Sequence, residues 1–173
     1  SKSEEKLKTI SNNYTIIRSN FSKLKEKLAD YQVDKVNGIL FDLGVSSVQI
    51  DDAKRGFSFH QDAKLDMRMD TTSSFSAYDV VNTYSYSELV RILRDYGEEK
   101  YATSISKNII KEREKQPIET TFQLVDIIKM SMPMKAMRDG HPARKTFQAI
   151  RIEVNHELDV LKTGLKQALD LLD

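Results

Sequence analysis

The chain has 173 residues, of which 39% are hydrophobic and 31% charged, with a formal net charge of +1 and no cysteine. This composition is typical of one folded core, or of half a core with a compact insertion, and excludes disordered chains, disulfides, thiol nucleophiles and cysteine-based zinc sites. No apolar run reaches the ~18 residues that span a bilayer and no charged-then-apolar leader is present, so we expect a cytoplasmic protein without membrane insertion.

The N-terminal part of the chain alternates between helical and strand patterns. Residues 3–11 carry apolar positions at helical spacing, and residues 14–17 predict a short β-branched strand. An Asn-Phe-Ser turn then precedes a predicted helix over residues 23–31. The apolar run over residues 36–43 is typical of a parallel strand buried on both faces. The order strand, helix, strand indicates the βαβ unit of an open α/β sheet.

Residues 44–72 lose this periodicity and are rich in Asp, Ser, Arg, Phe and Met, so we expect no regular element there. Long loops of this kind inside compact domains are usually functional or disordered. Four apolar anchors, Phe57, Phe59, Met67 and Met69, favour a packed loop.

The chain turns helical from residue 74 to residue 131. Two capping boxes, Ser85 with Glu88 and Thr120 with Gln123, mark helix starts. Residues 98–115 carry an apolar face between them, so three or four short helices should form a small bundle.

One long helix is predicted from Pro142 almost to the end of the chain, because its apolar residues recur every three or four positions over about seven turns. They are Phe147, Ile150, Val154, Leu158, Leu161, Leu165, Leu169 and Leu172. The final residues lack a glycine cap and a polar tail, so we expect the chain to be part of a larger sheet.

Asp42 stands at the end of the predicted strand, within the string DLGVSS. Ligands of open α/β sheets bind beyond the carboxyl ends of the strands, so this carboxylate is placed to contact one. Gly44 would let the backbone approach the ligand closely. Alternatively, Asp42 caps a turn at the strand end.

Four strings of the sequence stand out between Phe41 and Leu158, namely FDLGVSSVQIDDAKRGFSF, LDMRMD, YGEEKYA and HPARKTFQAIRIEVNHEL. In this order they resemble the 16S ribosomal RNA cytosine-N4-methyltransferases, the MraW family. The resemblance implies an α/β fold, namely a partial class I (Rossmann-like) methyltransferase sheet with an inserted helical bundle domain. Residues 1–70 would belong to the S-adenosylmethionine-dependent methyltransferase domain, 71–144 to a helical RNA-recognition insertion, and 145–173 to a helix returning to the sheet.

The resemblance also implies an activity, which is methylation of the exocyclic N4 amine of a cytidine in the decoding region of 16S ribosomal RNA, within the small ribosomal subunit. Phe21, Asp42 and Gln49 match positions that contact S-adenosylmethionine in the family. Asp42 is also the first catalytic candidate, because its carboxylate could accept a hydrogen bond from an N–H of the target amine. Phe21 would stack near the adenine or, alternatively, form a hydrophobic staple to the following helix. The chemistry requires no metal.

Parts of the family pattern are not found in this sequence. The glycine-rich GGHS-like loop, the ribose-binding carboxylate that follows it and the PGGR-like turn do not occur. The resemblance therefore implies that this chain alone binds S-adenosylmethionine weakly or not at all and is inactive by itself.

RNA recognition is expected from the basic side chains, because residues 135–151 carry several cations and a single acid. The candidates are Arg55, Arg68, Lys135, Arg138, His141, Arg144, Lys145 and Arg151. His141 precedes Pro142 at a helix start, so a capping or turn role is the alternative for it. Phe57 and Phe59 would stack a base extracted for reaction or pack in the core.

A second hypothesis comes from another functional class. The helical insertion and the basic stretch would also suit a noncatalytic RNA-binding or protein-interaction module that needs no cofactor. The sequence does not indicate an oligomeric state.

Overall fold

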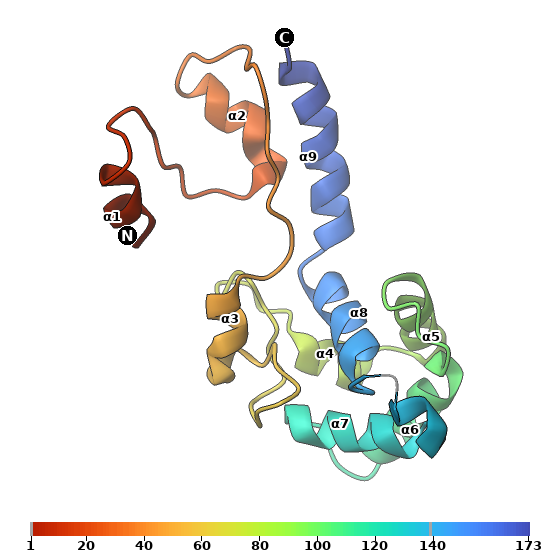
Figure 1. Ribbon diagram of the computed structural model, residues 1–173. Coiled ribbons are helices and arrows are strands. Elements are labelled where there is room, and N and C mark those ends of the chain that lie inside the picture. The colour runs from red at the N-terminus through yellow and green to blue at the C-terminus, as the bar shows by residue number, and fades with distance from the viewer. Residues whose placement is uncertain (1, 139) are drawn as a thin grey trace. The chain divides into compact units, whose positions relative to one another are not determined.

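The computed structural model describes residues 2–138 and 140–173 (Figure 1). The chain divides into two compact units, one made of Ser1–Asp42 with Leu158–Asp173 and the other of Leu43–Glu157. Residues 43–70, which the resemblance assigns to the methyltransferase domain, lie in the same compact unit as the helical bundle. All the regular elements among the described residues are helices, and none of these helices is long and apolar enough to cross a membrane.

The first unit contains short helical elements and one longer helix. Its elements are α1 (Lys2–Lys8), η1 (Phe21–Lys23), α2 (Leu24–Ala29) and α9 (Glu157–Leu171). The predicted N-cap forms, since the Asn20 side chain accepts a hydrogen bond from the Ser22 backbone N–H. Gln167 of α9 then fixes the next turn, because its Nε2 donates to the Ser22 carbonyl (2.6 Å) and its Oε1 accepts from the Lys25 N–H (2.9 Å). The bond from the Lys25 N–H satisfies one of the backbone donors that a helix start leaves unpaired.

Neither predicted strand forms among the described residues. Residues 14–17 make no sheet pairing, and the segment 36–43 pairs at one position, a parallel bridge between Val36 and Leu172. Leu40, predicted to be buried, is 95% exposed. A parallel strand needs neighbouring strands to pair its backbone and layers to cover both faces. The described residues supply neither, so the expected sheet is not present among them.

Gly164 is where α9 meets Phe21, and a side chain does not fit there. A Cβ at this position would lie 2.7 Å from Cδ2 of Phe21. The Phe21 ring also packs edge-on against Phe41, with centroids 5.6 Å apart. This close approach explains why a helix interior carries a glycine.

We expect Gly164→Ala to lower the free energy of unfolding by about 1 kcal/mol. The displaced Phe21 ring should cost about 1–3 kcal/mol as overpacking, which outweighs the gain of up to about 1 kcal/mol in helix propensity. Urea unfolding followed by circular dichroism measures the difference. Thr163→Ala, at the exposed neighbouring position, is the control and should not destabilise the chain. A more stable Gly164→Ala variant would contradict the contact.

The second unit contains the predicted bundle. Its elements are α3 (Ser47–Asp51), η2 (Ala53–Arg55), α4 (Ala77–Thr83), α5 (Tyr86–Asp95), α6 (Ala102–Arg113), α7 (Thr121–Met130), η3 (Met134–Arg138) and α8 (Arg144–Val154). Both predicted capping boxes are confirmed at the starts of α5 and α7. Helix α5 packs against α6 and α8, α6 against α7, and α4 against α8.

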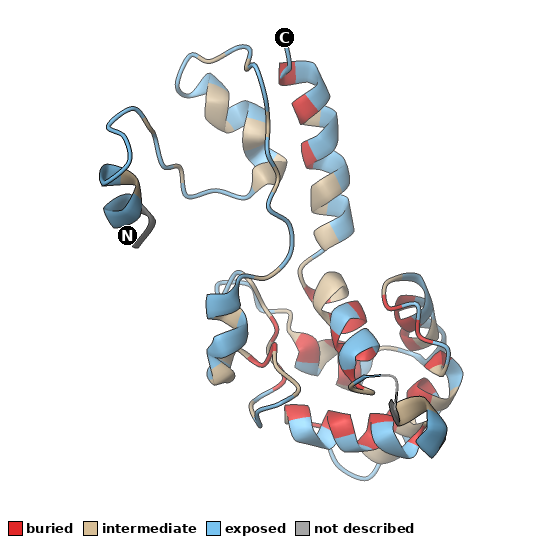
Figure 2. Cartoon of the chain, in the orientation of Figure 1, coloured by how far each residue is buried: buried red, intermediate tan, exposed pale blue. Residues whose placement is uncertain are grey.

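Buried residues, shown in red in Figure 2, recur along these helices and form the core of the unit. The loop before them contributes Leu65 and Met67, which are 2% and 0% exposed, so the predicted packed loop is confirmed. The expectation that residues 44–72 lack regular elements was wrong, because α3 and η2 lie there. Both are too short to show helical periodicity in the sequence.

The predicted single helix from Pro142 onward is two helices, with a break at Asn155 and His156. His156 adopts a left-handed conformation (φ 49°), which ends α8. The Asn155 side chain forms hydrogen bonds with the backbone of the loop before α4. Its Oδ1 accepts from the Met69 N–H (2.6 Å), and its Nδ2 donates to the Met67 carbonyl (2.7 Å). Tertiary hydrogen bonds thus interrupt a pattern that is helical throughout. Part of the predicted apolar stripe is exposed, including Leu169 at 76%.

Candidate functional site

Asp42, the catalytic candidate, is exposed at the end of the first unit. Among the described residues its carboxylate has no hydrogen-bond or ion-pair partner. The same unit contains Phe21, which is half-buried between Phe41 and Gly164. The unit therefore presents a carboxylate with free acceptors and a packed aromatic ring.

Gln49, the third cofactor candidate, lies in the second unit and has a local role. Its Oε1 accepts hydrogen bonds from the Ser46 backbone N–H (3.0 Å) and the Ser46 hydroxyl (3.1 Å). The Ser46 hydroxyl in turn accepts from the Gln49 N–H. This capping box fixes the start of α3.

Three of the candidate RNA-binding arginines have partners inside the second unit. The Arg55 guanidinium donates to the Arg68 carbonyl (2.6 Å) and lies 5.7 Å from the ring centroid of Phe57. Arg151 donates to both carboxylate oxygens of Glu157, at 2.7 and 3.1 Å, across the break between α8 and α9. RNA contacts by these side chains would compete with bonds that shape the unit.

Arg68 is held by Asp66 through two parallel bonds of 2.8 Å from its Nε and Nη2. Its Nη1 also donates to the Thr71 and Ser73 carbonyls. Hydrogen bonds from the Arg68 side chain hold the pKa of the Asp66 carboxyl below its usual value, although burial opposes them. The pair therefore fixes the loop that carries the string LDMRMD.

We expect Asp66→Asn to lower the free energy of unfolding by about 1–3 kcal/mol at pH 7, because a charge-assisted bidentate pair is lost. The pKa of Asp66 is depressed in the folded state, so this contribution is present above its unfolded value of about 4 and is lost as pH falls through the folded value. Urea unfolding of both proteins at pH 7 and pH 2.5 measures it. A difference between the two proteins that persists undiminished at pH 2.5 would contradict this account.

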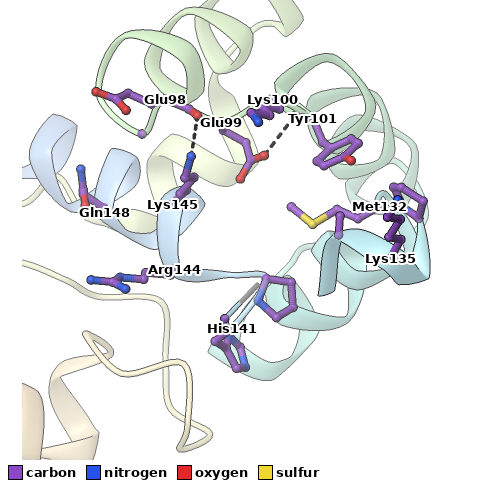
Figure 3. Close-up of a pocket in the computed structure, with 15 residues that line it drawn as sticks. Glu98, Glu99, Lys100, Tyr101, Met132, Lys135, His141, Arg144, Lys145 and Gln148 are labelled. Atoms are coloured by element: carbon purple, nitrogen blue, oxygen red, sulfur yellow. Dashed lines mark hydrogen bonds between the residues drawn. The ribbon is translucent and has the colours of Figure 1, made fainter. Parts of the chain in front are cut away.

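A pocket of about 740 Å³ lies within the second unit, between the turn at residues 97–101 and the segment 132–148 (Figure 3). The turn carries the string YGEEKYA, and the start of α8 carries HPARKTFQ. The two meet closely at Gly97, where a Cβ would lie 2.6 Å from the Lys145 carbonyl oxygen. Lys145 Nζ in turn donates to the Glu98 carbonyl (3.0 Å).

His141 has the turn role that was its alternative. Its Nδ1 accepts from the Ala143 N–H (3.3 Å), and its carbonyl accepts from the Arg144 N–H (3.1 Å). Its ring stacks on Phe59 with centroids 4.2 Å apart. Burial first, and then the nearby His60 and Lys129, lower the pKa of the His141 imidazole. The structure thus shows the His141 ring in a packing contact with Phe59 at the turn before α8.

The remaining basic candidates lie around the pocket. Arg144 and Lys135 are exposed and, among the described residues, have no hydrogen-bond or ion-pair partner, while Lys145 is exposed and makes the single bond to Glu98. The side chain of Arg138 lies outside the described residues. The structure therefore brings three of the predicted cations together at one opening.

The whole chain, residues 1–173, matches the model of the MraW methylase family. The chain belongs to this family. It is 57% identical over 169 residues to the ribosomal RNA small subunit methyltransferase H of Exiguobacterium sibiricum, covering 97% of this chain and 54% of that protein. It is 53% identical over 160 residues to the protein of the same name from Ruminiclostridium cellulolyticum (92% and 51%), and 52% over 159 residues to that from Lactobacillus delbrueckii subsp. bulgaricus (91% and 51%).

This MraW-family chain spans about half the length of the curated relatives it matches. Membership implies an α/β methyltransferase fold, of which the described residues show the helical part and one parallel bridge. In the first unit, the free carboxylate of Asp42 and the aromatic ring of Phe21 are groups that suit a nucleoside cofactor. Among the described residues, no group of three His, Asp or Glu side chains is placed to hold a metal ion.

Two further residues of the MraW-family chain line the pocket and were not among the predicted site residues. They are Glu99, which is 5% exposed, and Tyr101, which is half-buried. The sequence contained a signal for both residues, because both belong to the string YGEEKYA, which resembles the family. Charge alone could not select Glu99 from its exposed neighbours, since its burial depends on the packing of α5, α6 and α8.

Proposed function

We propose that the protein to which this chain belongs transfers a methyl group from S-adenosylmethionine to the exocyclic N4 amine of a cytidine in the decoding region of 16S ribosomal RNA. The observation that carries the proposal is the match to relatives named as small-subunit ribosomal RNA methyltransferases, at 52–57% identity over almost the whole chain. The small ribosomal subunit is the proposed partner. We propose a cytoplasmic location for the enzyme, because bacterial ribosomes lie in the cytoplasm.

The proposed reaction assigns a role to each of three residues of this chain. The N4 amine of cytosine is a poor nucleophile, because its lone pair is delocalised into the ring. When bound, S-adenosylmethionine supplies an activated methyl group. Asp42, whose carboxylate is free among the described residues, would accept an N–H of the amine and stabilise the positive charge that develops on nitrogen. Phe21 would hold the adenine, and Gln49 would contact the cofactor from the start of α3. Orientation of the two reactants accounts for the rest of the catalysis.

RNA binding is proposed for the basic side chains around the pocket of the second unit, namely Lys135, Arg144 and Lys145. Their ammonium and guanidinium groups suit phosphates, and they are exposed. Arg55, Arg68 and Arg151 are proposed to shape this surface through the internal bonds described above.

The experiment is a methyl-transfer assay on small ribosomal subunits, with the gene product that carries this sequence and radiolabelled S-adenosylmethionine. Digestion of the RNA to nucleosides followed by mass spectrometry identifies the product. N4-methylcytidine is expected at one position in the decoding region. A methyl group at ring carbon 5, at a ribose hydroxyl or at many positions would reject the proposal.

The second candidate function is a noncatalytic RNA-binding module. The observation that favours it is that the second unit has its own core and its own basic pocket, neither of which includes Asp42. Calorimetric titration with S-adenosylmethionine separates the two functions. RNA binding without any binding of this cofactor by the gene product would favour the module.

A further inference from the structure

We propose that the pocket between the turn 97–101 and the start of α8 takes one unpaired RNA nucleotide whose base carries an exocyclic amine, with Glu99 as the acceptor for that amine. This inference rests on the proposed function for the class of its ligand, which is RNA. It adds a base-reading role for Glu99 in the second unit, beside the cations that the proposed function assigns to RNA phosphates. The pocket volume of about 740 Å³ lies within the range of about 300–1,000 Å³ usual for small-molecule sites.

Glu99 is the group that gives the pocket its chemistry. It is 5% exposed, and its carboxylate points into the space beside Met132 and Tyr101 (Figure 3). Among the described residues, the Tyr101 N–H is the donor that reaches this carboxylate, at 3.0 Å from Oε1. A carboxylate has about four acceptor positions, and burying one with few donors costs free energy. A ligand that donates hydrogen bonds would satisfy the remaining acceptors.

The turn that carries Glu99 packs closely against the start of α8, so the acceptor is held in place before a ligand arrives. Glu98 adopts a left-handed conformation (φ 50°), which turns the chain sharply into Glu99. Gly97 and the Lys145 carbonyl leave no room between the turn and α8. The Lys145 Nζ bond to Glu98 closes the same junction. Backbone strain of this kind is often found at binding sites, and here it sets the direction of one side chain.

Apolar and aromatic surface lies next to the carboxylate. The half-buried side chains of Tyr101 and Met132 line the pocket on the side of α6 and of the segment after α7. Nucleic-acid bases stack on such surfaces with little preference for sequence. The combination of an aromatic and apolar wall with a buried carboxylate acceptor is suited to a base, which has an apolar face and a polar edge.

The positive charge around the pocket opening indicates that the part of the ligand outside the base is anionic. Lys135, Arg144 and Lys145 line the same pocket, and Arg144 is directed away from Glu99 (Figure 3). A base on Glu99 would therefore leave its phosphates among cations. Free phosphate deep in the pocket would face the Glu99 carboxylate, and a basic peptide would face the three cations, so both fit less well. A nucleotide satisfies the acceptor and the cations together.

The base is expected to be one that carries an amine rather than a carbonyl at the position that meets Glu99. Carboxylates accept from the N4 amine of cytosine in known modes of base recognition, whereas a carbonyl oxygen facing a carboxylate is repelled. Two matched pairs isolate this difference, because uracil replaces the amine of cytosine with a carbonyl, and hypoxanthine does the same for adenine. Cytosine and adenine should therefore be preferred over their partners.

The test measures binding of fluorescein-labelled single-stranded RNA hexamers of cytidine, uridine, adenosine and inosine to the full chain by fluorescence anisotropy. The wild-type chain is expected to bind the cytidine hexamer at least 5-fold more tightly than the uridine hexamer, and the adenosine hexamer at least 5-fold more tightly than the inosine hexamer. Glu99→Gln keeps the shape but removes the charge, and both ratios should fall below 2-fold. Thermal unfolding establishes that this variant is folded.

Two variants at exposed positions complete the design. Arg144→Ala is expected to weaken binding of all four hexamers by about 3-fold and leave both ratios unchanged, because it contacts phosphate. Lys111→Ala, an exposed lysine of α6 that does not line the pocket, is the matched control and should change neither affinity nor ratio. Equal binding of the two members of each pair by the wild-type chain, no binding of any hexamer, or ratios that survive in a folded Glu99→Gln would each overturn the proposal.

The outcome is independent of the proposed reaction. The hexamer assay contains no methyl donor and requires no transfer, so an inactive protein would still show the base preference. Conversely, N4-methylcytidine formed by a protein that treats all four hexamers alike would support the reaction and reject the pocket.

Discussion

Asp42→Asn is expected to lower the rate of methyl transfer to small ribosomal subunits by about 100-fold, with a smaller change in the KM for S-adenosylmethionine. Asparagine keeps the size of the side chain and one acceptor but removes the negative charge. The charge matters most as the N4 nitrogen becomes positive in the transition state, so the loss should appear mainly in kcat. Steady-state kinetics at saturating RNA, with S-adenosylmethionine varied, measure both constants.

Asp34→Asn is the matched control for this experiment, because Asp34 is an exposed carboxylate of the same unit and has no partner among the described residues. It should leave both constants unchanged. A rise in KM at constant kcat in Asp42→Asn would restrict Asp42 to cofactor binding. Wild-type kinetics in Asp42→Asn would remove it from the site.

Asn155→Ala is expected to lower the free energy of unfolding of the second unit by about 3 kcal/mol. The side chain makes three hydrogen bonds, accepting from the Met69 N–H and donating to the carbonyls of Met67 and Arg151. Truncation leaves partly buried backbone groups without partners, and each such group costs about 1–3 kcal/mol unless water reaches it. Met67 is buried in a left-handed conformation (φ 57°), which the backbone holds only with such support.

Urea unfolding followed by circular dichroism measures this loss, and Asn108→Ala provides a graded comparison. Asn108 makes a single side-chain bond, from its Nδ2 to the Ser131 hydroxyl (2.9 Å), and its removal should cost about 1 kcal/mol. Equal losses in the two variants would mean that the three bonds of Asn155 stabilise the loop no more than a single side-chain hydrogen bond does.

The helices of the bundle were predictable because their signals are local. Ser85 with Glu88, and Thr120 with Gln123, satisfy the first N–H groups of α5 and α7 from within three residues, so no distant contact is needed. The turn role of His141 follows from the same short-range logic. The packed loop was predictable from the density of its apolar side chains. Met67 and Phe57 are buried from water only if the loop packs against the bundle.

The errors have a common physical origin in long-range contacts. The helical pattern continues through Asn155, but bonds to Met67 and Met69 nearly ninety residues away interrupt the helix there. Leu40 reads as a buried strand residue, yet burial requires neighbouring strands, which the described residues do not provide. Arg68 and Arg151 look like free cations in the sequence, whereas Asp66 and Glu157 hold them.

The sequence by itself determined the family, through four strings in order, and the starts of the main helices, because motif chemistry and capping act over a few residues. Only the tertiary structure decided which cations remain available at the surface and that Glu99 is buried beside them. Those properties depend on which helices meet, and an exposed and a buried glutamate one residue apart have the same side chain and nearly the same local sequence.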